Sequence, residues 1–402
     1  MSSPAVQHFF LLGSTPELSW LELSQTFPDI CGLMRLSNQI AGSRILPPNF
    51  TPTQILAKLG GVVKIAQLIT ELPVNQGEPV ITEIISHLEQ GDNRVQFALA
   101  EWGRDHLPKI EPQTLKKQLI ETGKSVRYRT GPRSGLSAAI LLHEHDLQEI
   151  IVITTNDGTY LAKTSAVQNI DQWQIEDRAK PFAQHERGLL PPKVARMMVA
   201  ISLGKLSFDK KSDSTHTKLW DPFCGSGTVL FEGLLLGVPS VYGSDLDMES
   251  IRGTEQNWNW FAQAFQDHIT ANQSLVAFQS DATNLQAPPF EPRSISHIVT
   301  EPFLGKPTPN LKQISNIQSG LERMYKGMFK AWRPWLQPRA TIVCVFPKWQ
   351  LEGEYKQKTF DLHSLIDFLE PIGYTTSSEP VVYARPGAVV QREIWHFTYQ
   401  QI

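Results

Sequence analysis

The octapeptide DPFCGSGT, Asp221–Thr228, decides the fold of this chain. It follows THTKLW (215–220) and precedes the apolar run VLFEGLLLG (229–237), so we expect a strand, a glycine loop and a helix. Gly225 and Gly227 let the backbone turn sharply and approach a ligand closely. The first N–H groups of the helix then face an electron-rich ligand. Two glycines alone are also compatible with a purely structural turn; the complete octapeptide is more specific.

The loop differs from two common nucleotide-binding loops. A phosphate-binding P-loop of the form GxxxxGK[ST] has a lysine after its last glycine, and this loop has none. A dinucleotide fingerprint has a third glycine where this chain has Leu230. The loop therefore predicts a different class of ligand.

An α/β series surrounds the octapeptide from residue 201 onward. The expected elements are strands at 240–245, 275–281, 295–302 and 340–346, a helix at 248–265, and two long final strands within 380–399 around Arg385-Pro386-Gly387. Apolar runs without polar alternation are typical of a parallel sheet that is covered on both faces. We therefore expect a doubly wound, Rossmann-like sheet closed by a terminal hairpin over residues 201–402.

Two further acids each end a strand of this series. Asp245 closes SVYGSD, 24 residues after Asp221, where a ribose-binding acid is expected in a nucleotide-binding βαβ unit. Asp281 closes LVAFQSD and is placed to accept from an adenine amino group. Either acid can instead be a helix N-cap. Three acids at the ends of successive strands favour a shared site.

The next strand leads into Thr300–Gly305, which offers the groups needed to methylate an exocyclic amine. Such a reaction is a direct displacement, so positioning supplies much of the rate. The carboxylate of Glu301 can hold the N–H groups of the amine, and Phe303, after Pro302, can stack on the base. The alternative is a proline-containing loop with no catalytic part.

The first 170 residues predict two smaller α+β regions. Residues 1–75 have the order βαββαβ, which is ferredoxin-like. Residues 76–170 begin again and end in a hairpin whose turn is Asn156-Asp157-Gly158. Residues 171–200 are interpreted as a linker before the last domain.

One stretch of the chain is basic, although the formal net charge of the whole chain is −3. The stretch from Arg104 to Arg133 contains eight positively charged and three negatively charged residues, a local excess of five positive charges. The candidate nucleic-acid contacts in it are Lys116, Lys117, Lys124, Arg127, Arg129 and Arg133. The stretch is equally compatible with a solvated helix face followed by a strand edge.

Cysteine usage and hydropathy bear on the compartment. The three cysteines, Cys31, Cys224 and Cys344, are far apart and form no CxxC pair, which predicts neither a disulfide framework nor a metal site. No apolar stretch approaches the roughly 18 residues of a spanning helix, and the N-terminus lacks a basic leader. We therefore expect a cytoplasmic protein without a membrane partner. Trp332–Trp335 is interpreted as core rather than as a partner surface.

At these residues the sequence resembles the THUMP-domain tRNA guanosine-N2 methyltransferases of archaea and eukaryotes, which are class I amine methyltransferases. The resemblance covers nearly the whole chain and includes HERGLLPPKVARMM (185–198), similar to a segment that closes over the cofactor. It implies ferredoxin-like and THUMP-like domains that grip tRNA, before a class I methyltransferase domain that uses S-adenosylmethionine (SAM). The cofactor-binding residues it implies are Asp221, Gly225, Gly227, Thr228, Asp245, Asp281, Gly188, Leu190 and Pro192, and the catalytic ones are Glu301, Pro302 and Phe303.

The chain departs from the family in the loop after the fourth strand. The family pattern is Asp-Pro-Pro followed by an aromatic residue and glycine, whereas this chain has Glu301-Pro302-Phe303-Leu304-Gly305. Glutamate is one methylene longer, so its carboxylate sits differently over a guanine amine. Two alternatives therefore stay open: a DNA amine methyltransferase, and a SAM-binding RNA-binding protein whose site is impaired or needs an activating partner.

Overall fold

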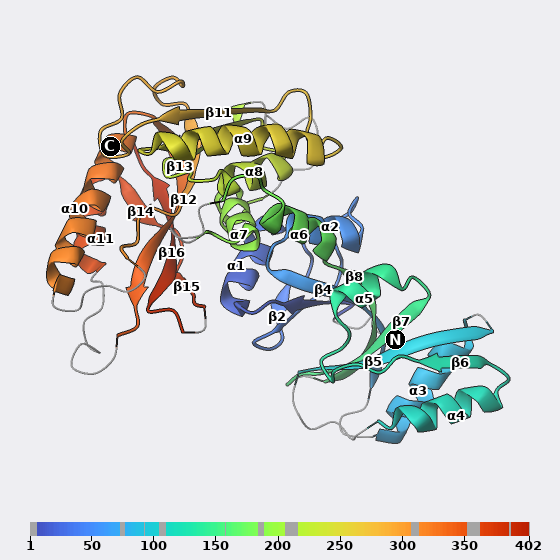
Figure 1. The fold of residues 1–402 in the computed structure, drawn as a ribbon. Helices are drawn as coiled ribbons and strands as arrows, with labels where there is room; N and C mark the ends of the chain where they lie inside the picture. The colour runs from blue at the N-terminus through green and yellow to red at the C-terminus, as the bar shows by residue number, and fades with distance from the viewer. Residues whose placement is uncertain are drawn as a thin grey trace. The chain divides into compact units, whose positions relative to one another are not determined.

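The computed structural model describes residues 6–72, 77–91, 93–103, 110–156, 158–183, 189–205, 216–306, 313–351, 362–385 and 387–401. The chain divides into two compact units, Met1–Gln174 and Ile175–Ile402, here called unit 1 and unit 2 (Figure 1). Each unit is built around its own eight-stranded sheet. Of the predicted site residues, Gly188 lies outside the described residues.

The first half of unit 1 has the expected βαββαβ order. Its elements are β1 His8–Leu12, α1 Pro16–Thr26, β2 Met34–Arg35, β3 Ile40–Ser43, α2 Pro52–Lys58 and β4 Val62–Leu72. Thr51 caps α2, because its hydroxyl accepts from the Gln54 N–H and the Gln54 side chain accepts from the Thr51 N–H. Thr15 precedes α1 without a side-chain cap. The strand order β2-β3-β1-β4 is that of a ferredoxin-like sheet.

The second half of unit 1 extends the same sheet. It consists of α3 Gly77–Glu89, β5 Arg94–Gly103, α4 Pro112–Glu121, β6 Ser125–Tyr128, α5 Ala138–His143, β7 Leu147–Thr154 and β8 Thr159–Val167. β8 pairs antiparallel with β4, which gives the order β2-β3-β1-β4-β8-β7-β5-β6. The regions 1–75 and 76–170 thus share one sheet; their division into separate domains stays a prediction.

A buried ion pair fastens the two halves of unit 1 together. Lys64 on β4 donates to both carboxylate oxygens of Glu149 on β7, each at 2.8 Å. Their side chains are 4% and 0% exposed. Thr164 on β8 and the backbone N–H of Leu136 also donate to Glu149. Burial lowers the pKa of Lys64, which the Glu149 charge opposes. A buried charge of this kind is tolerated only while its partners are in place.

Unit 2 contains the expected doubly wound sheet. Its elements after α6 Ile170–Arg178, a helix that spans the division, are α7 Pro192–Leu203, β9 Lys218–Asp221, α8 Thr228–Leu235, β10 Ser240–Asp245, α9 Met248–Ala264, β11 Ser274–Gln279, β12 Ile295–Thr300, α10 Ile314–Trp332, β13 Leu336–Trp349, α11 His363–Leu369, β14 Tyr374–Thr376, β15 Val381–Tyr383 and β16 Val390–Tyr399. The strand order is β11-β10-β9-β12-β13-β16-β14. The pairs from β11 to β13 are parallel, and β16 is antiparallel to β13.

Helices cover both faces of this sheet, as Figure 1 shows: α10 and α11 lie on one face, and α7, α8 and α9 on the other. The core under α10 includes Trp220, Trp332 and Phe346, all fully buried. Trp332 is therefore core, as predicted, and Trp335 packs against the same cluster.

The sequence pattern misses parts of unit 2. The helices α7, α10 and α11 are absent from the predicted series, as is the short strand β14. The first arm of the terminal hairpin is the three-residue strand β15 rather than a long strand, and β14 and β15 each pair with three residues of β16. Within the described residues, no helix combines the length and the apolar character that crossing a membrane requires.

Replacing Glu149 by Gln should destabilise unit 1 by about 3–5 kcal/mol, because the charge of Lys64 stays buried without a counter-charge. Hydrogen exchange of the intact chain, followed by mass spectrometry, should show faster exchange in β4, β7 and β8. The control is Glu121→Gln, which removes an exposed partner of Lys117 on α4. Equal protection in both variants would contradict a structural role for the buried pair.

Candidate active site

The candidate site lies at the carboxyl edge of three neighbouring parallel strands. β9 ends at Asp221, β10 ends at Asp245, and Glu301 directly follows β12. Because β10, β9 and β12 are adjacent and parallel, their ends meet at the same edge of the sheet. Open α/β sheets bind ligands in the crevice at this edge, where the order of the strands reverses. The strand order reverses between β9 and β12.

The glycine loop joins β9 to α8 with two left-handed residues. Gly225 has φ +52° and Gly227, which precedes α8, has φ +85°. A Cβ on Gly225 would meet nothing within 4 Å, so this part of the loop is open on the side where a ligand can approach. A Cβ on Gly227 would lie 2.9 Å from Phe231 and 3.1 Å from Thr254. The first glycine thus gives access, and the second lets the loop pack closely on α8 and α9.

Asp245 anchors the glycine loop. One of its carboxylate oxygens accepts from the Gly225 N–H at 3.1 Å, and the other accepts from the Asp247 N–H at 3.0 Å. Thr254 on α9 donates its hydroxyl to the Gly225 carbonyl at 2.8 Å. The half-buried carboxylate keeps lone pairs for further donors, because an ionised carboxylate accepts at about four positions.

Asp221 is buried beneath the loop. Its Oδ1 accepts from the Thr300 hydroxyl at 2.7 Å and from the Phe223 N–H at 3.1 Å. Burial raises the pKa of Asp221 to about 7, the two hydrogen bonds oppose this shift, and the charges of Asp245 and Glu301 add to it. The carboxyl group is therefore poised between its protonated and ionised forms near neutral pH.

Glu301 is held by an arginine from β16, which lies two strands from β12 in the sheet. Arg392 on β16 donates from Nε to Oε2 at 2.6 Å and from Nη2 to Oε1 at 2.9 Å, a two-pronged contact. Burial opposes the charged form of Arg392, but its hydrogen bonds to Glu301 and the charge of Glu301 raise its pKa overall. Bidentate contacts of this kind fix geometry as well as charge.

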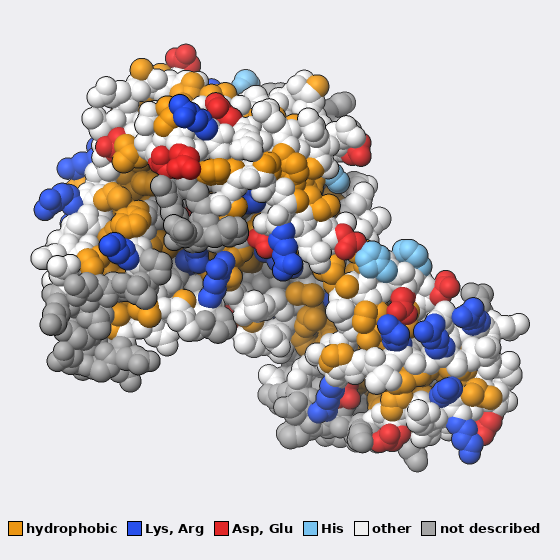
Figure 2. Space-filling model, viewed as in Figure 1, with side chains coloured by type: hydrophobic (Ala, Val, Ile, Leu, Met, Phe, Trp, Pro, Cys, Tyr) orange, Lys and Arg blue, Asp and Glu red, His pale blue; other side chains and the backbone are white. Residues whose placement is uncertain are grey.

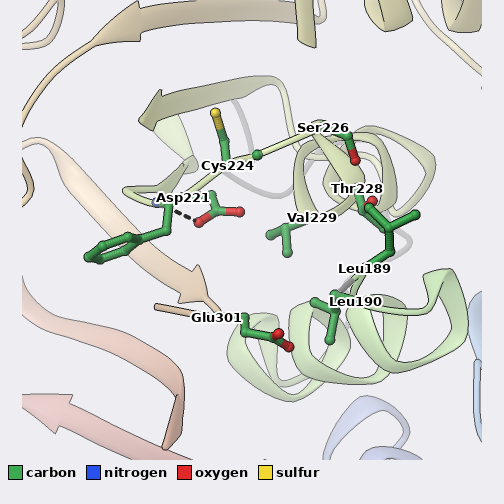
Figure 3. A pocket seen from close by; sticks show the side chains of 10 residues that line it. Leu189, Leu190, Asp221, Cys224, Ser226, Thr228, Val229 and Glu301 are labelled. Carbon is green, nitrogen blue, oxygen red and sulfur yellow. Dashed lines mark hydrogen bonds between the residues drawn. The ribbon is translucent and has the colours of Figure 1, made fainter. Parts of the chain in front are cut away.

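The acids line two cavities that share several residues. The larger has a volume of about 550 Å³ and is lined by Asp245, Glu301, Phe303, Arg385 and Arg392, among others. The smaller, of about 90 Å³, lies at the glycine loop and is lined by Asp221, Cys224, Thr228 and Leu190, with Glu301 again in its wall. Figure 3 shows Glu301 and Leu190 across this space from Asp221 and Cys224.

The structure brings most of the predicted cofactor and catalytic residues to these cavities. Pro302 and Phe303 line the larger one, and the Phe303 side chain is 58% exposed. Pro192 begins α7 and lines a separate small pocket with Thr228. Asp281 is exposed and lines neither of the two cavities. One of its oxygens accepts from the N–H and hydroxyl of Thr283. The predicted role of Asp281 at the adenine stays a prediction.

Half of the predicted RNA-binding cations carry an acidic partner. Arg129 pairs with Glu144 at 3.0 Å, Arg133 with Glu101 at 2.6 Å, and Lys117 with Glu121 at 4.0 Å. Lys124 donates to a backbone carbonyl and Arg127 to the Gln96 side chain. Figure 2 shows Lys and Arg side chains interspersed with Asp and Glu over this part of unit 1. Its surface is less basic than the sequence count indicates, because Glu101 and Glu144 come from outside the counted stretch.

Three residues hold other residues of the site in place, but no motif or spacing in the sequence predicts their contacts. Arg392 lies 91 residues from Glu301, and Thr300 lies 79 residues from Asp221. Lys180 donates to the Thr228 hydroxyl at 2.9 Å from 48 residues away. Each acts through a contact that only the folded sheet creates, so spacing along the chain does not reveal it.

Comparisons with known proteins agree with this geometry. Residues 185–351 match the family model described as UPF0020: RMKL-like, methyltransferase domain. The match includes the glycine loop, both strand-end aspartates and Glu301; it ends before Arg385 and Arg392.

Curated and solved relatives extend the comparison. The chain is 31% identical over 154 residues to a tRNA (guanine(10)-N2)-dimethyltransferase of Methanothermobacter thermautotrophicus; this covers 38% of the chain and 38% of that relative's length. The structure of TrmN from Thermus thermophilus matches 98% of the chain and 99% of its own, at a TM-score of 0.54 and 15% identity. The structure of SMU.472, solved in complex with S-adenosylhomocysteine, matches 100% of both chains, at a TM-score of 0.51 and 12% identity. The expected fold class is thereby confirmed.

The raised pKa of Asp221 predicts how the effect of replacing this residue on the free energy of unfolding depends on pH. The pKa is about 7 in the folded chain and near 3.8 in the unfolded chain, so the folded state binds more protons between these values. The contribution of Asp221 to the free energy of unfolding is therefore greatest at low pH and is lost as pH rises through about 7. Asp221→Asn lacks this dependence, so its stability relative to wild type should increase from pH 5 to pH 8 in urea titrations. Parallel pH curves would contradict the assignment; exposed Asp281→Asn is the control.

The two strand-end acids should differ in their effect on cofactor affinity. Asp245→Asn should weaken binding of S-adenosylhomocysteine (SAH) by roughly ten- to a hundredfold, because a hydrogen bond to a charged group is worth about 1.5–3 kcal/mol. Asp281→Asn should change it at most about fivefold, since exposed charges contribute roughly 0–1 kcal/mol. Calorimetric titration with SAH measures both constants. A large loss with Asp281→Asn alone would instead support the adenine role that the sequence suggests.

Proposed function

We propose that this protein is a SAM-dependent RNA methyltransferase that transfers a methyl group to the exocyclic N2 amine of a guanosine in tRNA. The observation that carries the proposal is the meeting of Asp221, Asp245 and Glu301 at two adjoining cavities, with Glu301 in the wall of both, inside a segment that matches a methyltransferase domain. The tRNA and guanine parts of the proposal draw on the curated relative, which acts on the guanine N2 amine of tRNA by its name.

The cavity fits SAM in size and in charge. About 550 Å³ lies within the usual range for small-molecule sites. Asp245 at the mouth of the glycine loop can accept from both ribose hydroxyls, and the open side of Gly225 admits a ligand close to the backbone. Asp221 supplies negative charge for a cofactor that carries a sulfonium and an ammonium group. When bound, SAM supplies a methyl group on positively charged sulfur for direct displacement by an amine nitrogen.

The chain's own residues then orient the acceptor. Glu301 accepts N–H hydrogen bonds from the target amine, which points the nitrogen toward the cofactor site and favours the positive charge that develops on it. The exposed ring of Phe303 stacks on the base, beside the cavity that Glu301 lines. The Phe303 carbonyl accepts from the buried Tyr325 hydroxyl at 2.9 Å, which fixes the loop that carries both residues.

Unit 1 supplies the contacts to the tRNA backbone in this proposal. Lys116, Lys117, Lys124 and Arg127 are its candidate phosphate ligands, together with Arg129 and Arg133 once their acidic partners are displaced. Such contacts make affinity depend on salt concentration. The three free cysteines agree with a reducing compartment, and the cytoplasm stays our expectation.

Replacing Glu301 separates transfer from cofactor binding. With labelled SAM and unmodified total tRNA, the wild type should place label in N2-methylated guanosine, identified after digestion to nucleosides. Glu301→Ala should lose most of this transfer, because the acceptor for the amine N–H groups is gone, while SAH affinity stays nearly unchanged. Glu322→Ala, at a partly buried acid on α10 that pairs with Lys326, is the matched control.

Three outcomes would change the assignment. Label in duplex DNA rather than tRNA would replace the proposed substrate. SAH binding without transfer to either polymer would favour the non-catalytic alternative. Full transfer by Glu301→Ala would show that another residue orients the amine.

A further inference from the structure

Glu301 and Arg392 form a pair that the methyltransferase domain match does not include. Arg392 lies on β16, beyond residues 185–351. The side chains of Arg392 and Glu301 are 12% and 16% exposed, so both charges are largely withdrawn from water. The positive charge of Arg392 compensates the negative charge of Glu301, which would otherwise be largely buried without a counter-charge.

The sheet register explains how the two residues meet. Thr300 at the end of β12 pairs with Cys344 on β13, whereas Arg392 pairs with Pro347, which is three residues further along β13. Arg392 therefore lies beyond the end of β12, where its side chain crosses the level of β13 to reach Glu301. A glutamate, one methylene longer than the aspartate of the related pattern, reaches toward this guanidinium.

The contact leaves half of the carboxylate available. An ionised carboxylate offers about four lone-pair positions, and the two-pronged contact with Arg392 uses one on each oxygen. Glu301 is in the wall of both cavities, so its remaining positions face the space between the glycine loop and the terminal hairpin.

We propose that Arg392 is a positioning residue, which holds the Glu301 carboxylate charged and oriented so that its free edge accepts the N–H groups of the target amine. The inference rests on the proposed function. It also accounts for the departure from the family pattern: the chain has exchanged a short acid for a longer one that is braced by an arginine from β16.

The electrostatic surroundings of Glu301 explain why its carboxylate needs Arg392 as a positively charged partner. Asp221 on β9 and Asp245 on β10 each line one of the two cavities that Glu301 borders, and both repel a further negative charge. Tyr325 on α10 and Tyr383 on β15 also face the pair, and burial raises the pKa of Tyr325. Arg385 lines the cavity and donates to the Leu189 carbonyl at 3.4 Å rather than to Glu301. Without Arg392, the Glu301 carboxylate would lose its counter-charge while these like charges remain.

The test compares Arg392→Gln and Arg392→Lys with wild type in single-turnover methyl transfer to unmodified tRNA between pH 5 and pH 9. Arg392→Gln should lower the rate by about tenfold to a hundredfold, because a reacting group displaced by 1 Å can cost roughly a hundredfold. Its rate should also rise with pH over a more alkaline range than in wild type. Arg392→Lys keeps the positive charge but donates to Glu301 from one nitrogen instead of two. It should therefore lose rate, while the pH range over which the rate rises stays that of wild type. SAH affinity should stay within about twofold in both.

Lys348→Gln is the matched control. Lys348 on β13 pairs with Glu393 on β16 at 3.3 Å, so the change removes a cation from the same strand pair at a distance from the cavity. It should leave both rate and pH range unchanged. In a Glu301→Gln background, Arg392→Gln should cost little further rate, because there is no carboxylate left to hold.

The outcomes separate this inference from the proposed function. A wild type that transfers no methyl group to tRNA would overturn the proposed function, and the inference with it. An active wild type whose Arg392→Gln variant keeps its rate and pH range would overturn the inference alone. A third result is that Arg392→Gln keeps the wild-type pH range and costs the same rate in the Glu301→Gln variant as in wild type. That result would assign Arg392 a structural role and would also overturn the inference. If Arg392→Gln does not fold, a wild-type rate in Arg392→Lys would decide against the two-pronged contact.

Discussion

Three carboxylates meet at one edge of a sheet because three neighbouring parallel strands end there. Asp221, Asp245 and Glu301 follow β9, β10 and β12, whose adjacency is fixed by the strand order. Like charges so close together would repel one another, and a different interaction makes each carboxylate tolerable in this place. Burial raises the pKa of Asp221 to about 7, backbone N–H groups hold Asp245, and Arg392 braces Glu301. A positively charged ligand suits such an edge.

The local parts of the site could be predicted from the sequence. DPFCGSGT encodes a strand end, two left-handed glycines and a helix start within eight residues, and all three are present. The position of Asp245 follows from the regular length of a βα unit. The βαββαβ order of the first residues is equally local, since each element is defined by its own pattern and its own turn.

Contacts between distant strands could not be predicted in this way. Arg392 carries no motif, and it reaches Glu301 only because β16 inserts next to β13 in antiparallel orientation. The basic stretch of unit 1 was counted along the chain, whereas folding brings Glu101 and Glu144 from outside that stretch against Arg133 and Arg129. Asp281 lies two residues beyond the end of β11, the edge strand of the sheet, which places it outside the lining of the two cavities.

The departure from the family loop has a structural explanation in this account. Residues 185–351 match the model of a methyltransferase domain, and the arginine that holds Glu301 comes from β16, outside that segment. In the proposed reaction, the positioning of the acceptor amine therefore depends on the terminal hairpin as well as on the loop itself. Arg385, on the same hairpin, contacts the Leu189 carbonyl, so the hairpin also meets the segment that borders the glycine loop.

A crystal structure of the intact protein with SAH tests the central claim most directly. The account predicts SAH in the cavity between the glycine loop and the terminal hairpin, with its ribose hydroxyls on the Asp245 carboxylate and Glu301 still paired with Arg392. SAH bound elsewhere, or a ribose without contact to Asp245, would contradict it.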